Sequence, residues 1–312
     1  MAKRLILRLL GLLRPNGAQA QQSATQTQQS HLELYFAASK GNKTALNQLR
    51  VRAEQGNVDA QFDLGFMYQN GDGVPKDSAQ AAQWYRKAAE QGLSGAQNSL
   101  GVMYANGNGV PKDSAQAAQW YRKAAEQDLS AAQINLGLMY ENGEGVPKDS
   151  AQAAQWYRKA AEQGDSTAQF NLGLMYYTGE GVRKDSAQAV RWYRKAAQQG
   201  LADAQYNLGV TYYTGKGVPK DSAQAVQWYR RAAEQGYAKA QYNLGLLYRN
   251  GDGVPKELVT AYMWFSLVAG QGIEPAKTNR DSIEKLMTAN EIAEAQRLSR
   301  EWKPKGPPAL LH

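Results

Sequence analysis

A segment of 36 residues recurs six times along this chain, and this repeat constrains the fold more than any other feature of the sequence. Six tryptophans mark the period, each 36 residues after the one before: Trp84, Trp120, Trp156, Trp192, Trp228 and Trp264. The six repeats cover residues 59–94, 95–130, 131–166, 167–202, 203–238 and 239–274. A period between about 20 and 50 residues is typical of a solenoid, in which each repeat packs mainly on its neighbours.

Each repeat is predicted to fold as two helices joined by a glycine-rich turn. In the first repeat, Gly71 ends the first helix, and Asp77 or Ser78 caps the second. Alanines and Tyr85 share one side of that second helix. Gly65 lies inside the first helix, where glycine costs about 1 kcal/mol relative to alanine. Its recurrence in every repeat indicates that another helix approaches closely at this point.

The six tryptophans lie on the second helices, near the alanines. We interpret them as core between repeats, because each can bury about 150–250 Å² of surface. The alternative is a row of stacking platforms for a ligand. At the end of the second helix, Asp128 stands where the first repeat has Gly92, so the sequence predicts a left-handed Asp and a less stable junction there.

The recurring pattern A-Q-x-x-L-G-x-x-Y-x-x-G-x-G-V-x-x-D…A…W-Y-x-x-A-A-x-Q-G resembles the Sel-1-like repeat (SLR), a variant of the tetratricopeptide (TPR) helix pair. The resemblance covers 59–274 without a gap. It implies an all-α, right-handed α/α solenoid of TPR-like helix pairs, with about sixteen helices in all, of the bacterial type. One departure is Arg183, which replaces the connector proline of the other repeats.

The segments flanking the repeats are predicted to cap the solenoid. Residues 31–58 have the character of a degenerate N-terminal helix pair, and 275–302 have that of C-terminal capping helices. Within the latter, Thr288 and Glu291 form a predicted capping box. Residues 303–312 are predicted to be a disordered tail.

The N-terminus has the three parts of a secretory signal peptide. Residues 1–20 combine a basic start, an apolar stretch and the ending Ala18-Gln19-Ala20, although Arg8 interrupts the apolar stretch. Residues 21–30 form a Gln-rich linker. We therefore expect a periplasmic or secreted protein, with a cytoplasmic one as the alternative.

Composition argues against several classes of function. The chain has no cysteine, and its two histidines are His31 and His312, so we expect no metal site, no cofactor and no enzymatic activity. Of the net charge of +8, +4 belongs to residues 1–20, and the remainder is spread over a long surface. We expect no nucleic-acid binding, no integral membrane span and a monomer.

The repeats differ from one another mainly on one stripe of the first helix. Counting from the first residue of each repeat, this stripe holds places one, four, eight and eleven. The resemblance implies that it lines a concave surface where partner peptides lie. Place eight stays apolar, as a half-buried floor, whereas the other places become aromatic or basic toward the C-terminus. The predicted contact residues are Phe62, Phe170, Tyr177, Tyr206, Tyr213, Lys239, Tyr242 and Arg249.

The sequence thus predicts a non-enzymatic scaffold or adaptor that binds a peptide or protein segment in a groove. Tyrosine favours this role, because one end of its side chain packs while the other donates a hydrogen bond. The alternatives are a hydrolase acting on cell-wall or other material and a structural spacer without a specific ligand.

Overall fold

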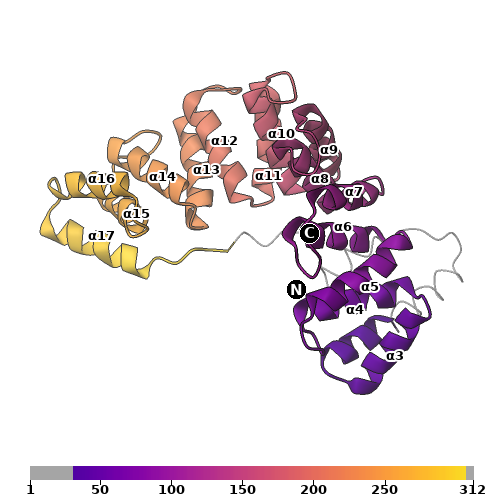
Figure 1. The fold of residues 1–312 in the computed structure, drawn as a ribbon. Coiled ribbons are helices and arrows are strands. Elements are labelled where there is room, and N and C mark those ends of the chain that lie inside the picture. The colour runs from indigo at the N-terminus through magenta and orange to yellow at the C-terminus, as the bar shows by residue number, and fades with distance from the viewer. Residues whose placement is uncertain (1–30, 307–312) are drawn as a thin grey trace, which may run out of the picture. The chain divides into compact units, whose positions relative to one another are not determined.

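The computed structural model describes residues 31–306, and every regular element in this range is a helix (Figure 1). Fifteen helices are labelled α3 to α17, and a further helical stretch covers residues 31–39. The predicted all-α solenoid of about sixteen helices is therefore confirmed. The predicted signal peptide and Gln-rich linker lie outside the described residues.

The helices follow the predicted pairs. The first helices of the six repeats are α4 (Val58–Asn70), α6 (Ser94–Asn106), α8 (Ser130–Asn142), α10 (Ser166–Thr178), α12 (Ala202–Thr214) and α14 (Ala238–Asn250). The second helices are α5 (Ser78–Glu90), α7 (Ser114–Ala125), α9 (Ser150–Glu162), α11 (Ser186–Gln198), α13 (Ser222–Glu234) and α15 (Leu258–Ala269). The flanking helices are α3 (Lys43–Glu54), α16 (Glu274–Glu284) and α17 (Ala289–Glu301).

The chain divides into two compact units, the first ending at Trp156 and the second beginning at Tyr157. Helices α3 to α8 belong to the first unit and α10 to α17 to the second. The boundary falls within α9.

Local sequence sets the helix ends as expected. Gly71 follows α4 with φ of 84°, in the left-handed conformation. Asp77, rather than Ser78, caps α5, and its side chain accepts hydrogen bonds from the backbone N–H groups of Ala79 and Gln80. Asp128 has φ of 61° and is the non-glycine residue with positive φ among residues 31–306. The left-handed Asp predicted at this junction is confirmed.

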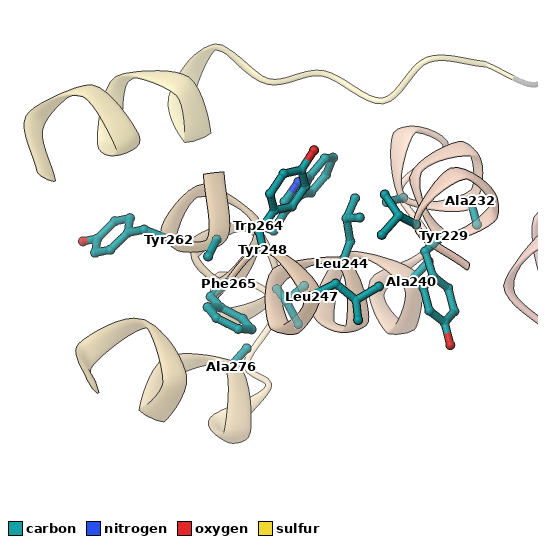
Figure 2. Packing of buried hydrophobic residues seen from close by; sticks show 14 of the residues in the cluster. Tyr229, Ala232, Ala240, Leu244, Leu247, Tyr248, Tyr262, Trp264, Phe265 and Ala276 are labelled. Carbon is teal, nitrogen blue, oxygen red and sulfur yellow. The ribbon is translucent and has the colours of Figure 1, made fainter. Parts of the chain in front are cut away.

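In five of the six repeats the two helices meet where the glycine of the first contacts a ring of the second. A Cβ added to Gly65 would lie 2.6 Å from Cδ1 of Tyr85, whose side chain is fully buried. The same arrangement holds in other repeats, at Gly101–Tyr121, Gly173–Tyr193, Gly209–Tyr229 and Gly245–Phe265. The predicted close approach is therefore confirmed. Figure 2 shows this core at the C-terminal end, where Leu244 of α14 and Phe265 of α15 are both fully buried.

The tryptophans join successive repeats, as predicted. Trp120 of α7 packs against the cluster that α5 of the preceding repeat forms with α6 of its own repeat. The ring is only half-buried, and Lys123 places Nζ 4.2 Å from the ring centroid. A cation from the same helix also lies over Trp84, Trp192 and Trp228. The chain's own cations thus cover the rings that the platform alternative would offer to a ligand.

Two series of polar contacts that were not predicted from the sequence also connect the repeats. Nη2 of Arg86 in α5 donates to Tyr104 Oη in α6 over 2.8 Å. Equivalent pairs are Arg50–Tyr68, Arg122–Tyr140, Arg158–Tyr176, Arg194–Tyr212 and Arg230–Tyr248. In the second series, buried Gln97 donates to the carbonyl of Ala89 and accepts from Gln127. These contacts satisfy the buried amide and fix the register of adjacent helix pairs.

Both ends of the described chain are covered by flanking segments. At the N-terminal end, His31 Nε2 lies 2.8 Å from Oδ2 of buried Asp63 in α4. At the C-terminal end, Thr288 and Glu291 form the predicted capping box of α17. Residues 303–306 are not helical, but they are held: Lys305 N–H donates to the carbonyl of Glu234 over 2.7 Å. The predicted disordered tail therefore does not begin at residue 303, because this segment packs beside α13.

Candidate functional site

The eight predicted contact residues lie on four of the first helices. Phe62 lies on α4, and the other seven lie on α10, α12 and α14 in the second compact unit. At the fourth place are Phe62, Phe170, Tyr206 and Tyr242, and at the eleventh are Tyr177, Tyr213 and Arg249. Lys239 occupies the first place of the sixth repeat.

Residues at the fourth place pack on the second helix of their own repeat. Phe62 is 6% exposed, and its ring centroid lies 5.5 Å from that of Tyr85. It belongs to the core, so its prediction as a contact residue is wrong. The reason is that the nearby glycine admits the Tyr85 ring, and the fourth place then packs against that ring. The later pairs, Phe170–Tyr193, Tyr206–Tyr229 and Tyr242–Phe265, have similar distances, but their first members keep partial exposure.

Tyrosines at the eleventh place lie at the surface beside lysines. Tyr213 is 36% exposed, and Nζ of Lys220 lies 5.5 Å from its ring centroid. Tyr177 is half-buried, and Lys216 of the next repeat donates to its Oη over 3.4 Å. Each exposed cation–π contact of this type contributes about 0.5–1 kcal/mol. The tyrosine rings and their lysines therefore form a mixed aromatic and cationic surface.

Arg249 is partly engaged by the C-terminal cap. Its Nη1 donates to Oδ1 of Asn279 in α16, and its Nε donates to Oδ1 of Asn250 over 3.1 Å. Asn279 Nδ2 in turn donates to Tyr242 Oη over 3.0 Å. Asn279 thus links two predicted contact residues. Arg249 is therefore less available to an acidic partner than the sequence predicts.

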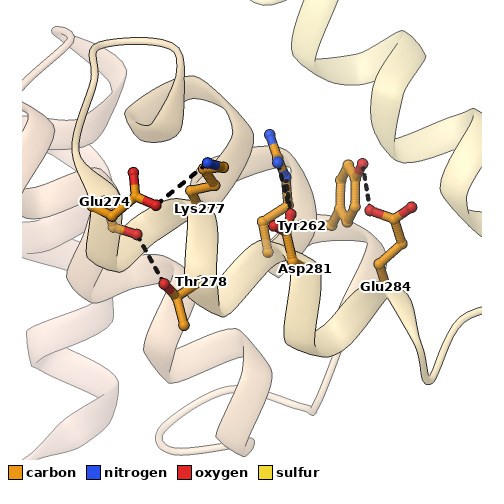
Figure 3. A network of polar contacts seen from close by, with 7 residues as sticks. Tyr262, Glu274, Lys277, Thr278, Asp281 and Glu284 are labelled. Atoms are coloured by element: carbon orange, nitrogen blue, oxygen red, sulfur yellow. Dashed lines mark hydrogen bonds and ion pairs between the residues drawn. The ribbon is translucent and has the colours of Figure 1, made fainter.

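Polar contacts along α16 hold this cap in place. Tyr262 Oη of α15 donates to Oε2 of Glu284 over 3.2 Å. At the other end of α16, Lys277 pairs with Glu274, whose carbonyl accepts from Thr278 Oγ1 over 3.2 Å (Figure 3). These two contacts lie within α16 and hold its first turns, whereas Asn279 connects the helix to Tyr242 and Arg249 of α14.

A pocket of about 290 Å³ lies between α12, α14 and the start of α16. Three of the eight predicted residues line it, namely Tyr206, Lys239 and Tyr242. The rest of the lining is Ala238, Asn243, Val268, Ile273 and Pro275. Apolar walls with few polar groups are typical of pockets that bind an apolar group and orient it.

The charge at this pocket comes from Lys239. Its side chain is exposed, and it forms no ion pair within residues 31–306. Nearby, Asp203 accepts a hydrogen bond from Tyr237 Oη over 2.9 Å. Burial and this hydrogen bond raise the pKa of Tyr237 to about 12, so Tyr237 stays neutral and keeps Asp203 occupied. Lys239 is the free cation of the pocket.

Place eight has the apolar, partly exposed character that was predicted for a floor. Leu174 of α10 is 38% exposed, and Val210 and Leu246 of the next two first helices are half-buried. The stripe on α10, α12 and α14 is thus apolar along its middle.

Neither a metal cluster nor a membrane span is found in the part of the chain that the structure describes. No three His, Cys, Asp or Glu side chains in 31–306 are grouped so that they could hold an ion. No helix in this range has both the length and the apolar character needed to cross a bilayer.

The Sel1 repeat profile matches the chain six times in succession, over residues 58–93, 94–129, 130–165, 166–201, 202–237 and 238–273. The chain belongs to the Sel1 repeat family. The matched segments begin one residue before the repeats counted from the sequence. Sel1 repeats commonly mediate protein–protein interactions, and the family consists generally of non-catalytic scaffolds.

Two solved bacterial structures are similar to this Sel1 repeat protein. One is a protective antigen present in uropathogenic Escherichia coli strains, which displays an SLR fold; the identity is 36%, over 92% of this chain and 71% of that chain, with a TM-score of 0.64. The other is a Sel1 repeat protein from Oxalobacter formigenes, with 38% identity over 77% of this chain and 95% of that chain and a TM-score of 0.68. No curated protein sequence matches the chain significantly.

Part of the site lies at the end of the sixth repeat and beyond it, and was not predicted from the sequence. Ile273 lies near the end of that repeat and Pro275 just after it, and both line the pocket, while Asn279 of α16 links Tyr242 with Arg249. The sequence does contain a signal for this cover, because the second helix of the sixth repeat is far more apolar than those of the other repeats and needs a covering segment. The side chains that this cover would bring to the stripe could not be read from the repeat pattern.

Proposed function

We propose that this Sel1 repeat protein is a non-enzymatic scaffold that binds a segment of another protein along α10, α12 and α14. The observation that carries the proposal is the pocket between α12, α14 and α16. Tyr206, Lys239 and Tyr242, each chosen as a contact residue from the variation between repeats, line this one pocket. The family's common role in protein–protein interaction supports the same conclusion.

The chemistry of the pocket defines the segment that it suits. Its apolar walls, formed in part by Val268 and Ile273, favour one large apolar side chain. Lys239 at the edge favours a carboxylate next to that side chain. The tyrosines at the eleventh place, half-buried Tyr177 and exposed Tyr213, extend the contact surface toward α10. We therefore propose a partner segment with an apolar anchor and a neighbouring acid.

The proposal includes where the protein acts and in what state. The leader at 1–20 supports export to the periplasm or outside the cell, and we propose a monomer that binds no nucleic acid. Mass spectrometry of the mature N-terminus in fractionated cells tests the export. A chain beginning at Gln21 outside the cytoplasm is the expected result, and a full-length chain in the cytoplasm contradicts it.

A photo-crosslinking experiment tests the binding surface. A photoreactive amino acid at position 239 should give one discrete crosslinked partner in cells that produce the protein. The control is the same amino acid at Ala131, which occupies the first place of the third repeat and is also exposed. Equal crosslinking from both positions, or none from 239, would contradict the proposal.

A charge reversal then tests the predicted chemistry of the partner. Lys239→Glu should abolish copurification of the crosslinked partner, because it places an acid beside the partner's acid, while Ala131→Glu should not. Both variants should keep the thermal stability of the original protein, since both side chains are exposed. If the protein is a structural spacer without a specific ligand, crosslinking from position 239 should not differ from crosslinking from position 131. The hydrolase alternative has no supporting observation and requires turnover by the purified protein.

A further inference from the structure

The fourth repeat differs from the others in its charge. Residues 167–202 contain five basic and two acidic residues, a net charge of +3, whereas the third repeat has −2 and the fifth has +1. Two arginines cause much of this difference. Arg183 replaces the connector proline, and Arg191 replaces a glutamine of the second helix. The excess of charge is therefore local.

Arg183 lies at a second pocket, of about 520 Å³. This pocket is lined by Arg158 from α9, by Tyr176 from α10 and by Val182, Arg183, Lys184, Asp185 and Gln188 from the connector and the start of α11. All of these residues belong to the second compact unit. The pocket shares no lining residue with the pocket around Lys239.

Of the cations in this pocket, Arg158 is oriented by a hydrogen bond, and Arg183 and Lys184 can bind an anion. Arg158 Nη2 donates to Tyr176 Oη over 2.7 Å, which orients the guanidinium and leaves its other N–H groups unused. Within residues 31–306, neither Arg183 nor Lys184 forms an ion pair. Their positive charges are therefore not neutralised by the protein.

The one carboxylate in the lining is already engaged. Oδ1 of Asp185 accepts hydrogen bonds from the backbone N–H groups of Ala187 and Gln188 at 2.9 and 3.0 Å, as the N-cap of α11. It therefore lowers the net charge of the pocket but does not pair with the cations. Three cations and one carboxylate leave a net charge of +2.

We propose that this pocket binds a phosphate group, carried by a monoester or present as the free ion. Two guanidinium groups match the oxygens of a tetrahedral oxyanion through paired N–H donors, and a lysine adds a point charge. A phosphate monoester carries a charge of about −1.5 to −2 at neutral pH, which balances the pocket, whereas a carboxylate carries a single negative charge. Arg191, farther along the exposed side of α11, adds to the positive potential.

The other repeats show why Arg183 decides the site. In the fifth repeat, Arg194 donates to Tyr212 Oη over 2.9 Å, and Lys220 and Asp221 occupy the places of Lys184 and Asp185. The fifth repeat therefore has the same arginine–tyrosine contact, lysine and aspartate as the fourth, but Pro219 stands in place of Arg183. This repeat is a natural control within the chain.

Titration with inorganic phosphate, phosphoserine and acetate, followed by NMR of the full chain, tests the proposal. We expect phosphate and phosphoserine to shift the amide signals of Arg183 to Gln188, and acetate to have little effect at equal concentration. Tighter binding of phosphoserine than of phosphate indicates a phosphorylated side chain as the source, and the reverse order indicates the free ion. Shifts with acetate equal to those with phosphate would overturn the proposal.

Two exchanges between repeats sharpen the test. Arg183→Pro restores the connector of the other repeats, so it should keep the fold while weakening phosphate binding about fivefold or more. Pro219→Arg should create a second site in the fifth repeat. Unchanged binding by Arg183→Pro, with unchanged melting, would overturn the proposal. Lys239→Glu should leave phosphate binding unaltered, so this site and the proposed partner surface can fail independently.

Discussion

At the scale of single residues, backbone conformation explains which positions the repeats keep constant. The second helices of the first and third repeats are followed by Gly92 and Gly164, with φ of 94° and 96°. The second repeat has Asp128 at the same point, with φ of 61°. A left-handed conformation costs a side chain with a Cβ free energy that glycine does not incur. Near-identity of the repeats therefore reflects backbone geometry as well as packing.

Asp128→Gly should raise the free energy of unfolding by about 1 kcal/mol, because it removes this cost at an exposed position. The weak hydrogen bond from Gln133 to Asp128, at 3.3 Å, offsets little of the gain. Urea denaturation measures the change. The matched control is Gly92→Asp, which should lower the free energy by a similar amount, since nothing lies within 4 Å of the added Cβ and only the backbone differs. A loss of stability in Asp128→Gly would contradict this account.

At the scale of elements, contacts between helices divide into apolar crossings and polar pairs. The crossing of α6 on α7 depends on Gly101 and Tyr121, whereas Arg86 and Tyr104 connect α5 to α6. The repeat pattern predicted the first kind, because glycine inside a helix is otherwise unfavourable. It did not predict the second, because an arginine and a tyrosine eighteen residues apart have no local relation in the sequence. Only packing brings them together.

The helical stretch at 31–39 is attached to α4 by the pair His31–Asp63, and this contact should depend on pH. Burial opposes the charged form of His31, but the hydrogen bond and the charge of Asp63 outweigh it, so the pKa of His31 is raised above 6.5. Asp59 also favours the charged imidazole, while Arg52 opposes it. Burial raises the pKa of Asp63, which His31 partly counteracts.

A raised pKa of His31 in the folded chain stabilises the fold fully below the unfolded value of about 6.5, and this stabilisation is lost as pH rises through the folded value. The free energy of unfolding of the first compact unit should therefore be lower at about pH 8.5 than at about pH 6. Amide hydrogen exchange in α4, corrected for the intrinsic rate, measures the difference. In His31→Gln this difference should disappear. A stability that rises over the same interval would show that the pair does not hold the helix.

At the scale of the whole chain, the sequence predicts the structural features that recur in every repeat, but few of the contacts made by residues outside the repeat pattern. Six copies of one pattern predicted the helix pairs, their glycine crossings and the role of the tryptophans. The same comparison selected Tyr206, Lys239 and Tyr242, which line one pocket. It also selected Phe62, because variation alone does not separate a buried aromatic from an exposed one. Pro275 and Asn279 were missed because they follow the last repeat, and Ile273 was missed because it lies outside the stripe of the first helix that was compared between repeats.

The C-terminal cap should be necessary for the last repeat and not for the first ones. Ile283 of α16 is 1% exposed and belongs to the cluster that contains Phe265 and Val268 of α15. Ile283→Asp buries an unpaired carboxylate, which should cost about 3 kcal/mol or more and release α16 from α15. Because each repeat packs mainly on its neighbours, the effect should stay local. Hydrogen exchange should accelerate in α14 and α15 while α4 to α7 remain protected.

Leu286 provides the matched control for this change. It lies three residues later and is 69% exposed, so Leu286→Asp should alter the stability by no more than about 0.5 kcal/mol. The binding surface gives a second readout, because Pro275 and Asn279 of α16 contribute to the pocket and to the contacts of Tyr242. Ile283→Asp should therefore weaken partner capture at position 239, whereas Leu286→Asp should not. Uniform acceleration of exchange in all helices of both compact units would show instead that the chain unfolds as one cooperative body.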